Sequence, residues 1–193
     1  MECSKKKPLN YSVAKSGNVN KNLIMKNLIF INGTMGVGKT AISQILKKML
    51  PKAVFLDGDW CWDMSPFTVT DETKKMVEDN IIYLLNNFIS CSEYENIIFC
   101  WVMHEQSIID ELLERLNTEK CRVHKYSLVC IEEALIDRIN KDINSGVRKE
   151  DVIARTVPRL KKYYNMDTVK VDVSEIDAER AAEVIYEHIT DRK

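Results

Sequence analysis

The residues with the clearest chemical meaning form a glycine-rich stretch near the start of the chain. Residues 33–40, GTMGVGKT, have the pattern G-x-x-x-x-G-K-T. Glycine lets the backbone take positive φ angles and approach an anion, so that successive N–H groups converge on phosphate oxygens. Lys39 can neutralise phosphate charge, and the Thr40 hydroxyl can ligate Mg²⁺. The pattern predicts a phosphate-binding loop formed by Gly33, Thr34, Met35, Gly36, Val37, Gly38, Lys39, Thr40 and Ala41.

The segments on either side of this loop have the context that the motif requires. Residues 27–32, NLIFIN, predict a buried strand, and residues 40–50 predict an amphipathic helix that ends at Pro51. The positive end of such a helix adds to the attraction for phosphate. A chance match in a tight turn is the alternative, and it occurs on the order of 1% of the time or less at ordinary glycine content.

Two carboxylates follow the second predicted strand, residues 53–56. Asp57 and Asp59 lie at positions i and i+2. Ligands bind at the carboxyl ends of strands in an open α/β sheet, so this tip should lie beside the phosphate loop. Asp57 can join Thr40 at a Mg²⁺ ion, and Asp59 can accept the proton of an attacking hydroxyl. A plain Asp-Gly turn is the alternative.

Bulky aromatic side chains follow the acidic pair. Trp60, Trp62 and Phe67 either stack on a flat acceptor molecule or form a hydrophobic plug under the next helix. His104 and Glu105, at the tip of the third predicted strand, either bind acceptor hydroxyls or cap a helix. The sequence leaves both pairs of alternatives open.

A group of arginines lies between the fourth and fifth predicted strands. Its members are Arg138, Arg148, Arg155 and Arg159. Phosphoryl transfer needs such cations, because the negative charge on the γ-phosphoryl oxygens must be stabilised away from water. We expect Arg138 and one of Arg148 or Arg155 to contact phosphates, with a hinge at residues 144–146. A solvated basic helix face is the alternative.

Short apolar runs alternate with helix-length amphipathic segments along the rest of the chain. This alternation predicts an α/β protein, a three-layer α/β/α P-loop NTPase fold with a five-stranded parallel sheet. The polar residues 1–26 predict a flexible N-terminal tail, which leaves 27–193 as one domain. The further strands are predicted at 96–103, 122–130 and 168–173, and the further helices at 71–91, 105–117, 132–143, 149–164 (interrupted near Pro158) and 178–189.

Composition and net charge limit the classes of molecule to which the chain is expected to bind. The 193 residues carry a formal net charge of −1, which gives no general attraction to nucleic acid or to an anionic membrane. No apolar run approaches the length of a membrane span, and no apolar run follows the charged residues 5–7 as in a secretory signal. The six cysteines show no zinc-like spacing. We therefore expect a cytoplasmic monomer or homodimer.

The pairing of GTMGVGKT with FLDGD at residues 55–59 resembles the small-molecule kinases related to gluconate, shikimate and adenylylsulfate kinases. Residues 56–59, followed by MSP at 64–66, are also similar to chloramphenicol phosphotransferase and tunicamycin-resistance-type proteins. The resemblance spans about residues 25–189. It implies the sheet order 2-3-1-4-5, a helical lid at about 138–160, ATP and Mg²⁺ as cofactors, and Asp59 as the base.

Two departures from the resembled families concern the acceptor pocket. Trp62 stands where gluconate kinases carry a histidine, and residues 103–105 (MHE) stand where shikimate kinases carry three glycines. The acceptor pocket should therefore be more aromatic than in those kinases.

These features predict an ATP-dependent phosphotransferase. It would move the γ-phosphate to a hydroxyl or phosphate of a small molecule, with Lys39, Asp57, Asp59 and Arg138 as the catalytic residues. A nucleoside or nucleotide kinase is one alternative, which the aromatic cluster permits. An ATPase switch without an acceptor is another, although a switch has no need of a base on the acceptor side.

Overall fold

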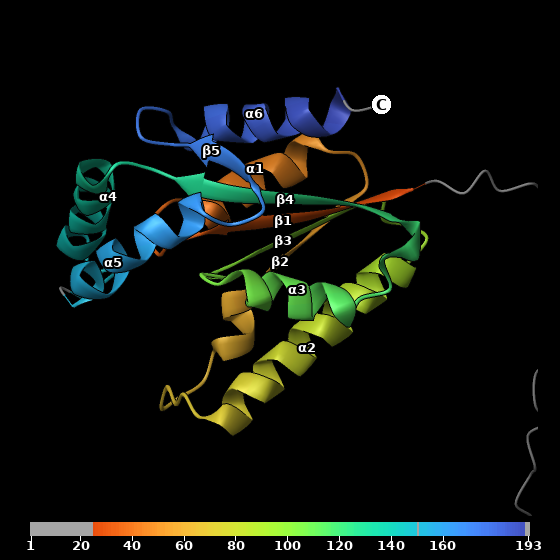
Figure 1. The fold of residues 1–193 in the computed structure, drawn as a ribbon, viewed down its shortest axis with the longest axis horizontal. Coiled ribbons are helices and arrows are strands. Elements are labelled where there is room, and N and C mark those ends of the chain that lie inside the picture. Colours follow the sequence, from red (N-terminus) through yellow and green to blue (C-terminus); the bar gives the residue numbers. More distant parts are fainter. Residues whose placement is uncertain (1–24, 150, 192–193) are drawn as a thin grey trace, which may run out of the picture.

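The computed structural model describes residues 25–149 and 151–191, which form an α/β fold (Figure 1). The five strands of this part of the chain are β1 (Lys26–Gly33), β2 (Ala53–Asp57), β3 (Asn96–Trp101), β4 (Cys121–Val129) and β5 (Val169–Asp172). Its six α-helices are α1 (Lys39–Met49), α2 (Asp71–Ser90), α3 (Gln106–Glu114), α4 (Glu132–Asn144), α5 (Val152–Tyr164) and α6 (Ala178–Thr190). Two 3₁₀ helices, η1 (Gly58–Trp62) and η2 (Thr118–Lys120), were not predicted.

The strands form one parallel sheet in the order β2-β3-β1-β4-β5, as predicted. In the register of this sheet, Asn32 lies opposite both Trp101 and Ser127, and Asp57 lies opposite Cys100. The carboxyl ends of β1, β2 and β3 therefore meet at one edge. That edge carries the start of the glycine-rich loop and the acidic pair.

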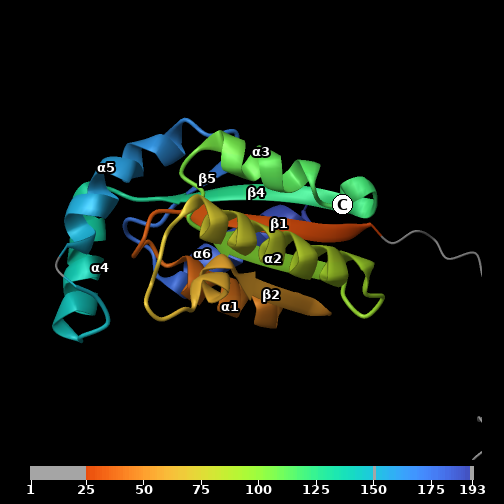
Figure 2. The same cartoon turned by 90° about the horizontal axis from the view of Figure 1, so that it is seen from below.

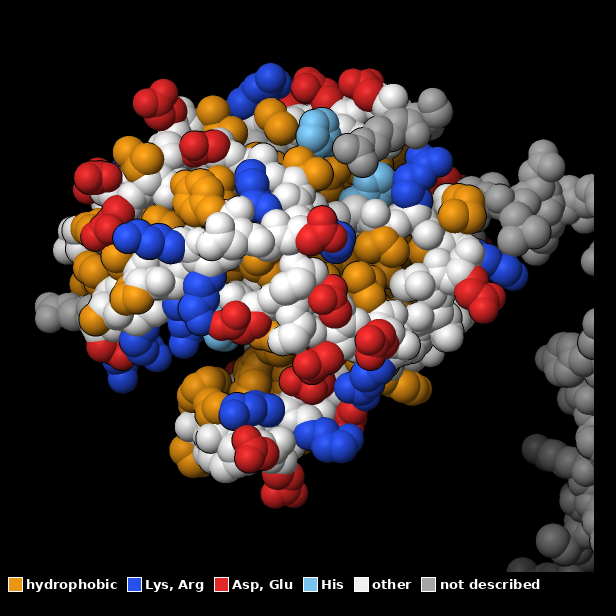
Figure 3. Space-filling view, viewed as in Figure 1, with side chains coloured by type: hydrophobic (Ala, Val, Ile, Leu, Met, Phe, Trp, Pro, Cys, Tyr) orange, Lys and Arg blue, Asp and Glu red, His pale blue; other side chains and the backbone are white. Residues whose placement is uncertain are grey.

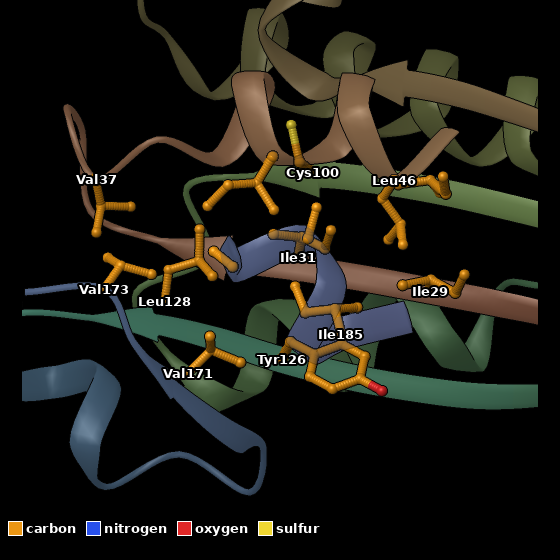
Figure 4. Close-up of a cluster of buried hydrophobic side chains, with 14 of the residues drawn as sticks. Ile29, Ile31, Val37, Leu46, Cys100, Tyr126, Leu128, Val171, Val173 and Ile185 are labelled. Atoms are coloured by element: carbon orange, nitrogen blue, oxygen red, sulfur yellow. The ribbon is translucent and has the colours of Figure 1, made fainter. Parts of the chain in front are cut away.

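Helices cover both faces of the sheet, as apolar residues on both faces of the strands predict. Helices α1 and α6 lie on one face and α2 and α3 on the other (Figures 1 and 2). Alternate residues of β1 supply both cores: Leu28 and Phe30 pack toward α2 and α3, and Ile29 and Ile31 pack toward α1 and α6. Figure 4 shows the second of these cores, where Ile31, Leu46 and Ile185 gather between sheet and helices.

Helices α4 and α5 lie together beyond the carboxyl ends of the strands (Figure 1). Helix α5 was predicted to be interrupted near Pro158, and this prediction is wrong, because Pro158 lies inside a continuous helix. A proline removes the hydrogen bond to the carbonyl of residue i−4. Here that residue is Ala154, which is exposed, so water can replace the missing donor.

The start of the compact fold differs slightly from the prediction. Strand β1 begins at Lys26, one residue before the predicted boundary, and Lys26 Nζ donates a hydrogen bond to the Ile89 carbonyl at 2.6 Å. The rest of the predicted tail, residues 1–24, lies outside the described residues. Within the described residues, no helix combines the length and apolar character that crossing a membrane requires.

Candidate active site

The glycine-rich loop joins β1 to α1 and has the backbone that anion binding requires. Gly38 has φ 104° and precedes α1, whose first turn receives no hydrogen bond from a capping side chain. The N–H groups of that turn are thus left for an anion, which the helix dipole also attracts. At Gly33, φ 153°, an added Cβ would lie 2.8 Å from Val37 Cγ1 and 3.0 Å from the Leu128 carbonyl oxygen. The loop therefore tolerates no side chain there.

Lys39 is held inside this loop. Its ammonium group donates to the Thr34 carbonyl at 3.0 Å, and the residue is buried. Burial lowers the pKa of Lys39, and the nearby carboxylates of Asp59 and Asp57 partly oppose that effect. A desolvated cation so close to converging N–H groups is suited to hold phosphate oxygens.

Asp57 and Thr40 form a pair of oxygen ligands. The Thr40 hydroxyl donates to Asp57 Oδ2 at 2.6 Å, while Asp57 Oδ1 accepts from the Asp59 N–H at 3.0 Å. No cluster of three or more His, Cys, Asp or Glu that could hold a metal occurs in the described residues. Mg²⁺ needs no such cluster, because it is commonly held by one or two protein oxygens together with substrate phosphates. The residues present therefore fit Mg²⁺.

Asp59 lies in η1, directly after β2, and its side chain is accessible from the cavity described below. The surrounding walls desolvate the carboxylate, and this desolvation, followed by the charge of Asp57, raises the pKa of Asp59. A hydrogen bond from the Trp101 side chain opposes the shift. A carboxylate with a raised pKa beside a phosphate loop is suited to general base catalysis.

A cavity of about 870 Å³ opens above the acidic pair. Figure 3 shows the molecule hollowed between the segment that leads into α2 and helix α5. Of the predicted acceptor residues, Asp59, Trp60, Trp62, Phe67 and His104 line this cavity. Its other lining residues are Met35, Asp57, Asp63, Val69, Lys74, Glu78, Trp101, Val102, Ile108 and Arg159.

The structure does not bring Glu105 into the cavity with the other predicted acceptor residues. Glu105 forms an ion pair with Lys162 of α5 and is not among the lining residues. Its neighbour His104 does line the cavity, and His104 Nδ1 is buried without a hydrogen-bond partner in the described part of the chain. Burial, and then the charges of Arg159 and Lys162, lower the pKa of His104. The imidazole is therefore neutral at pH 7.

The predicted catalytic residue Arg138 lies away from the acidic pair. Its guanidinium donates to the Val173 carbonyl, and the residue lines a small cavity of about 120 Å³ that also contains Gly38 and Ile176. Residues 173–177 connect β5 to α6, so Arg138 lies on the α1–α6 side of the glycine-rich loop. This placement gives no direct support for contact with the reacting phosphate, and one guanidinium nitrogen, Nη1, is buried without a partner in the described residues.

The other lid arginines differ in their relation to the site. Arg148 forms a 2.7 Å ion pair with Asp142, and its charge lowers the pKa values of both Lys39 and Asp59, so it lies near the site. Arg155 pairs with Asp151, and its side chain is 57% exposed. The sequence-based choice missed Arg159, which lines the large cavity and forms no ion pair with any described residue. Spacing gave no signal that would prefer Arg159, because Arg155 lies at i and Arg159 at i+4 of the same helix and only Arg159 lines the cavity.

The buried side-chain amide of Asn32, which the sequence analysis missed, connects several segments at the carboxyl edge of the sheet. Asn32 Oδ1 accepts from the N–H groups of Gly33 at 2.8 Å and Met103 at 3.0 Å. The second bond explains why β3 ends at Trp101 rather than at the predicted Met103. Asn32 Nδ2 contacts Ser127 Oγ at 3.4 Å and Met166 Sδ at 3.2 Å. One side chain thus fixes both the start of the phosphate loop and the turn that carries His104.

Comparison with known proteins agrees with this geometry. A family model described as "AAA domain" matches residues 29–158, and the chain belongs to that family. A search of curated proteins gives no match. Among solved structures, the tunicamycin resistance protein of Deinococcus radiodurans is similar, with a TM-score of 0.63 and 17% identity over 85% of this chain and 95% of that chain.

Two kinases of small molecules also share the fold. Shikimate kinase from Acinetobacter baumannii, solved in complex with shikimate, has a TM-score of 0.60 and 20% identity over 90% of this chain and 98% of its own. A gluconokinase from Sinorhizobium meliloti has a TM-score of 0.58 and 16% identity over 88% and 98%. The predicted resemblance to small-molecule P-loop kinases is thus confirmed for the fold, and the chain has a kinase-like P-loop fold with a nucleotide-binding loop.

Proposed function

We propose that this chain is an ATP-dependent kinase that transfers the γ-phosphate to a hydroxyl of a small molecule. The observation that carries the proposal is the position of Asp59, whose backbone N–H bonds to Asp57 while its carboxylate opens into a cavity of about 870 Å³. A cavity of this size is typical of small-molecule sites. An ATPase switch would need neither the cavity nor a carboxylate with a raised pKa within it.

Each part of the site has a distinct role in this proposal. The N–H groups of the glycine-rich loop and the Lys39 ammonium bind the β- and γ-phosphates. Thr40 and Asp57 hold Mg²⁺, which when bound neutralises phosphate charge and orients the phosphates. Asp59 orients the acceptor hydroxyl and takes its proton, and Arg148 and Arg159 stabilise charge from the lid side. Positioning and electrostatics supply most of the rate, as expected for a loose transition state.

The proposal includes the expected setting of the enzyme. A cytoplasmic kinase that acts as a monomer or homodimer, and that binds neither nucleic acid nor membrane, is consistent with the net charge of −1. In this proposal the lid at about residues 138–160 takes in the second half of α4, the turn at Gly146 and most of α5. Gly146 has φ 75°, a backbone angle that glycine adopts readily, in the turn between α4 and α5.

The test is incubation of the protein with ATP, Mg²⁺ and a panel of nucleosides, sugar acids and hydroxylated antibiotics. We expect mass spectrometry to find one added phosphate on at least one member of the panel, with ADP formed in equal amount. Release of ADP and inorganic phosphate at the same rate with every compound, and no phosphorylated product, would instead support the switch.

A further inference from the structure

We propose that the acceptor of this kinase is an uncharged molecule with a flat ring and a free hydroxyl. The ring would stack against the aromatic wall of the large cavity, formed by Trp60, Trp62, Phe67 and Trp101. This inference rests on the proposed function and specifies the acceptor of the same site.

The first argument is the exposure of this aromatic wall. Trp60 is 55% exposed and Phe67 is 68% exposed, although both line a cavity. Large apolar side chains gathered at a hollow and left open to solvent mark a binding site, since burying them against a ligand is favourable. In Figure 3 hydrophobic side chains lie on one rim of the hollow, and Lys and Arg side chains lie on the facing rim.

The second argument is that neighbouring rings restrict the aromatic side chains before any ligand binds. Trp60 packs edge-on against the buried Phe55, with ring centroids 5.3 Å apart and planes at 72°. Trp62 packs against Phe67 with centroids 5.8 Å apart. Rings that are already ordered lose little conformational freedom when a ligand stacks on them. The wall is therefore suited to a flat, rigid acceptor.

The third argument is the charge of the cavity. Its lining includes four acidic side chains, Asp57, Asp59, Asp63 and Glu78, and two basic ones, Lys74 and Arg159. The charge of Lys74 is already balanced by Asp71, 3.2 Å away. The remaining cation, Arg159, lies close enough to His104 to lower its pKa, on the lid side where phosphate charge collects during transfer. Lys39 and Arg148 also act on Asp59, but we assign both to the phosphates, so an anionic acceptor would meet this acidic excess and be repelled.

The fourth argument concerns the hydroxyl. Two polar side chains among the lining residues can contact a hydroxyl: the Asp59 carboxylate and the His104 imidazole. A few polar groups within an otherwise apolar site usually fix the orientation of a ligand. A hydroxyl bound beside these side chains can donate to the Asp59 carboxylate, and the imidazole adds a second polar group to the same cavity.

Direct binding tests this inference independently of catalysis. The probes are thymidine and 1-phenyl-1,3-propanediol, which are uncharged and aromatic, and shikimate and gluconate, which are anions. We expect calorimetry with the full chain, the ATP analogue AMP-PNP and Mg²⁺ to show at least about tenfold tighter binding of one uncharged probe than of either anion. Trp60→Leu should weaken that binding at least about fivefold, because the ring of the probe then loses the indole on which it stacks. Tyr83→Leu, which alters an aromatic side chain that is 70% exposed on α2 and is not among the residues lining the cavity, should leave it unchanged.

A second pair of variants tests the charge argument. Combining Asp63→Asn with Glu78→Gln should raise the affinity for shikimate at least about fivefold, because two acidic charges leave the cavity.

Tighter binding of an anion than of both uncharged probes, or equal affinity of Trp60→Leu and the wild type, would overturn the inference. So would failure of both uncharged probes to bind at millimolar concentration. Binding of an uncharged probe without its phosphorylation by ATP would support the proposed ligand class and contradict the kinase proposal. Phosphorylation of an anion alone would support the kinase proposal and contradict the proposed acceptor class. The choice between thymidine and the phenyl diol separates nucleosides from other aromatic alcohols.

Discussion

At the scale of single residues, Asp57 and Asp59 show how two neighbouring carboxylates come to differ. Asp57 is buried, and both its oxygens accept hydrogen bonds, from Thr40 and from the Asp59 N–H. Asp59 opens into the cavity, where desolvation and the charge of Asp57 raise its pKa. When two neighbouring carboxylates have such different surroundings, one commonly serves structure or metal binding and the other serves proton transfer.

Replacing the proposed base should separate binding from turnover. We expect Asp59→Asn to lower kcat at least about a hundredfold, the scale of a lost general base, while the affinity for AMP-PNP stays within about twofold. Asp63→Asn is the matched control, because Asp63 lines the same cavity, and it should retain most of the activity. Steady-state kinetics and calorimetry measure the two quantities. Normal turnover in Asp59→Asn would remove this residue from the mechanism.

The raised pKa of Asp59 also has a consequence for stability. In the folded protein Asp59 holds its proton to higher pH than in the unfolded chain, where the pKa is about 3.9. Stability from this residue is therefore present below the unfolded pKa and is lost as pH rises through the folded pKa. We expect Asp59→Asn to be slightly more stable than the wild type at pH 7, the effect being small because the side chain is accessible to solvent. Urea unfolding at pH 7 and near pH 3 should show this difference shrink at the lower pH, and an unchanged difference would contradict it.

At the scale of elements, the site depends on how closely η1 approaches the end of β3. A Cβ added to Gly58 would lie 2.5 Å from Trp101 Cγ and 2.6 Å from Trp101 Cδ1. The Trp101 side chain also lies close enough to the Asp59 carboxylate to lower its pKa. The glycine therefore lets the segment that carries the base pack directly on the indole ring.

A side chain at position 58 should disturb this packing. We expect Gly58→Ala to lower the free energy of unfolding by about 1–3 kcal/mol, the usual cost of overpacking, and to lower kcat as Asp59 shifts. Chemical denaturation and kinetics test both effects. Adding Trp101→Leu to Gly58→Ala should recover part of the lost stability, because the clashing ring is gone. Additive losses in the double variant would show that the two residues do not interact.

The buried amide of Asn32 connects β1 to the turn after β3. Asn32→Leu would leave the Gly33 and Met103 N–H groups buried without their acceptor, and each such loss costs about 1–3 kcal/mol. We expect lower stability together with weaker AMP-PNP binding, since the phosphate loop loses its anchor. Asn80→Leu, at an exposed position on α2, is the control and should change neither quantity. Loss of stability with unaltered nucleotide affinity would limit Asn32 to a structural role.

These elements also show what the sequence alone can predict. The strand–loop–helix pattern around residues 33–40 was predicted, because it follows from local periodicity and a motif with strict backbone demands. The sheet order was predicted only from the resemblance to small-molecule P-loop kinases. The contacts that complete the site were not predicted from the sequence. Asn32, Trp101 and Arg159 act through partners tens of residues away, and Asn32 alone meets residues of β4 and of the turn after β3. The placement of Arg138 beside Val173 likewise depends on tertiary packing that no spacing reveals.

At the scale of the whole molecule, the carboxyl edge of the sheet gathers segments from most of the chain. The phosphate loop, η1, the turn after β3 and the helices α4 and α5 all meet there, and the Thr34 hydroxyl bonds to the Thr156 carbonyl of α5 at 3.2 Å. A ligand that contacts several of these segments should therefore stabilise the entire fold.

Nucleotide binding should be visible as thermal stabilisation. AMP-PNP with Mg²⁺ at about 100 times its Kd adds about 2.7 kcal/mol, which raises the Tm of a domain of this size by about 5–10 °C. Scanning calorimetry measures the shift, and excess EDTA should remove much of it, because Thr40 and Asp57 then lose the ion that links them to the phosphates. Lys39→Ala should show little shift at the same ligand concentration. A shift of equal size in that variant would contradict the proposed phosphate site.

The most direct test of the central claim is a crystal structure with AMP-PNP and Mg²⁺. We predict the β- and γ-phosphates on the N–H groups of residues 33–40, the ion on Thr40 and Asp57 directly or through water, and Asp59 facing the γ-phosphate across the cavity. A nucleotide bound elsewhere, or an Asp59 carboxylate turned away from the γ-phosphate, would contradict the assignment of this edge of the sheet as the site of phosphoryl transfer.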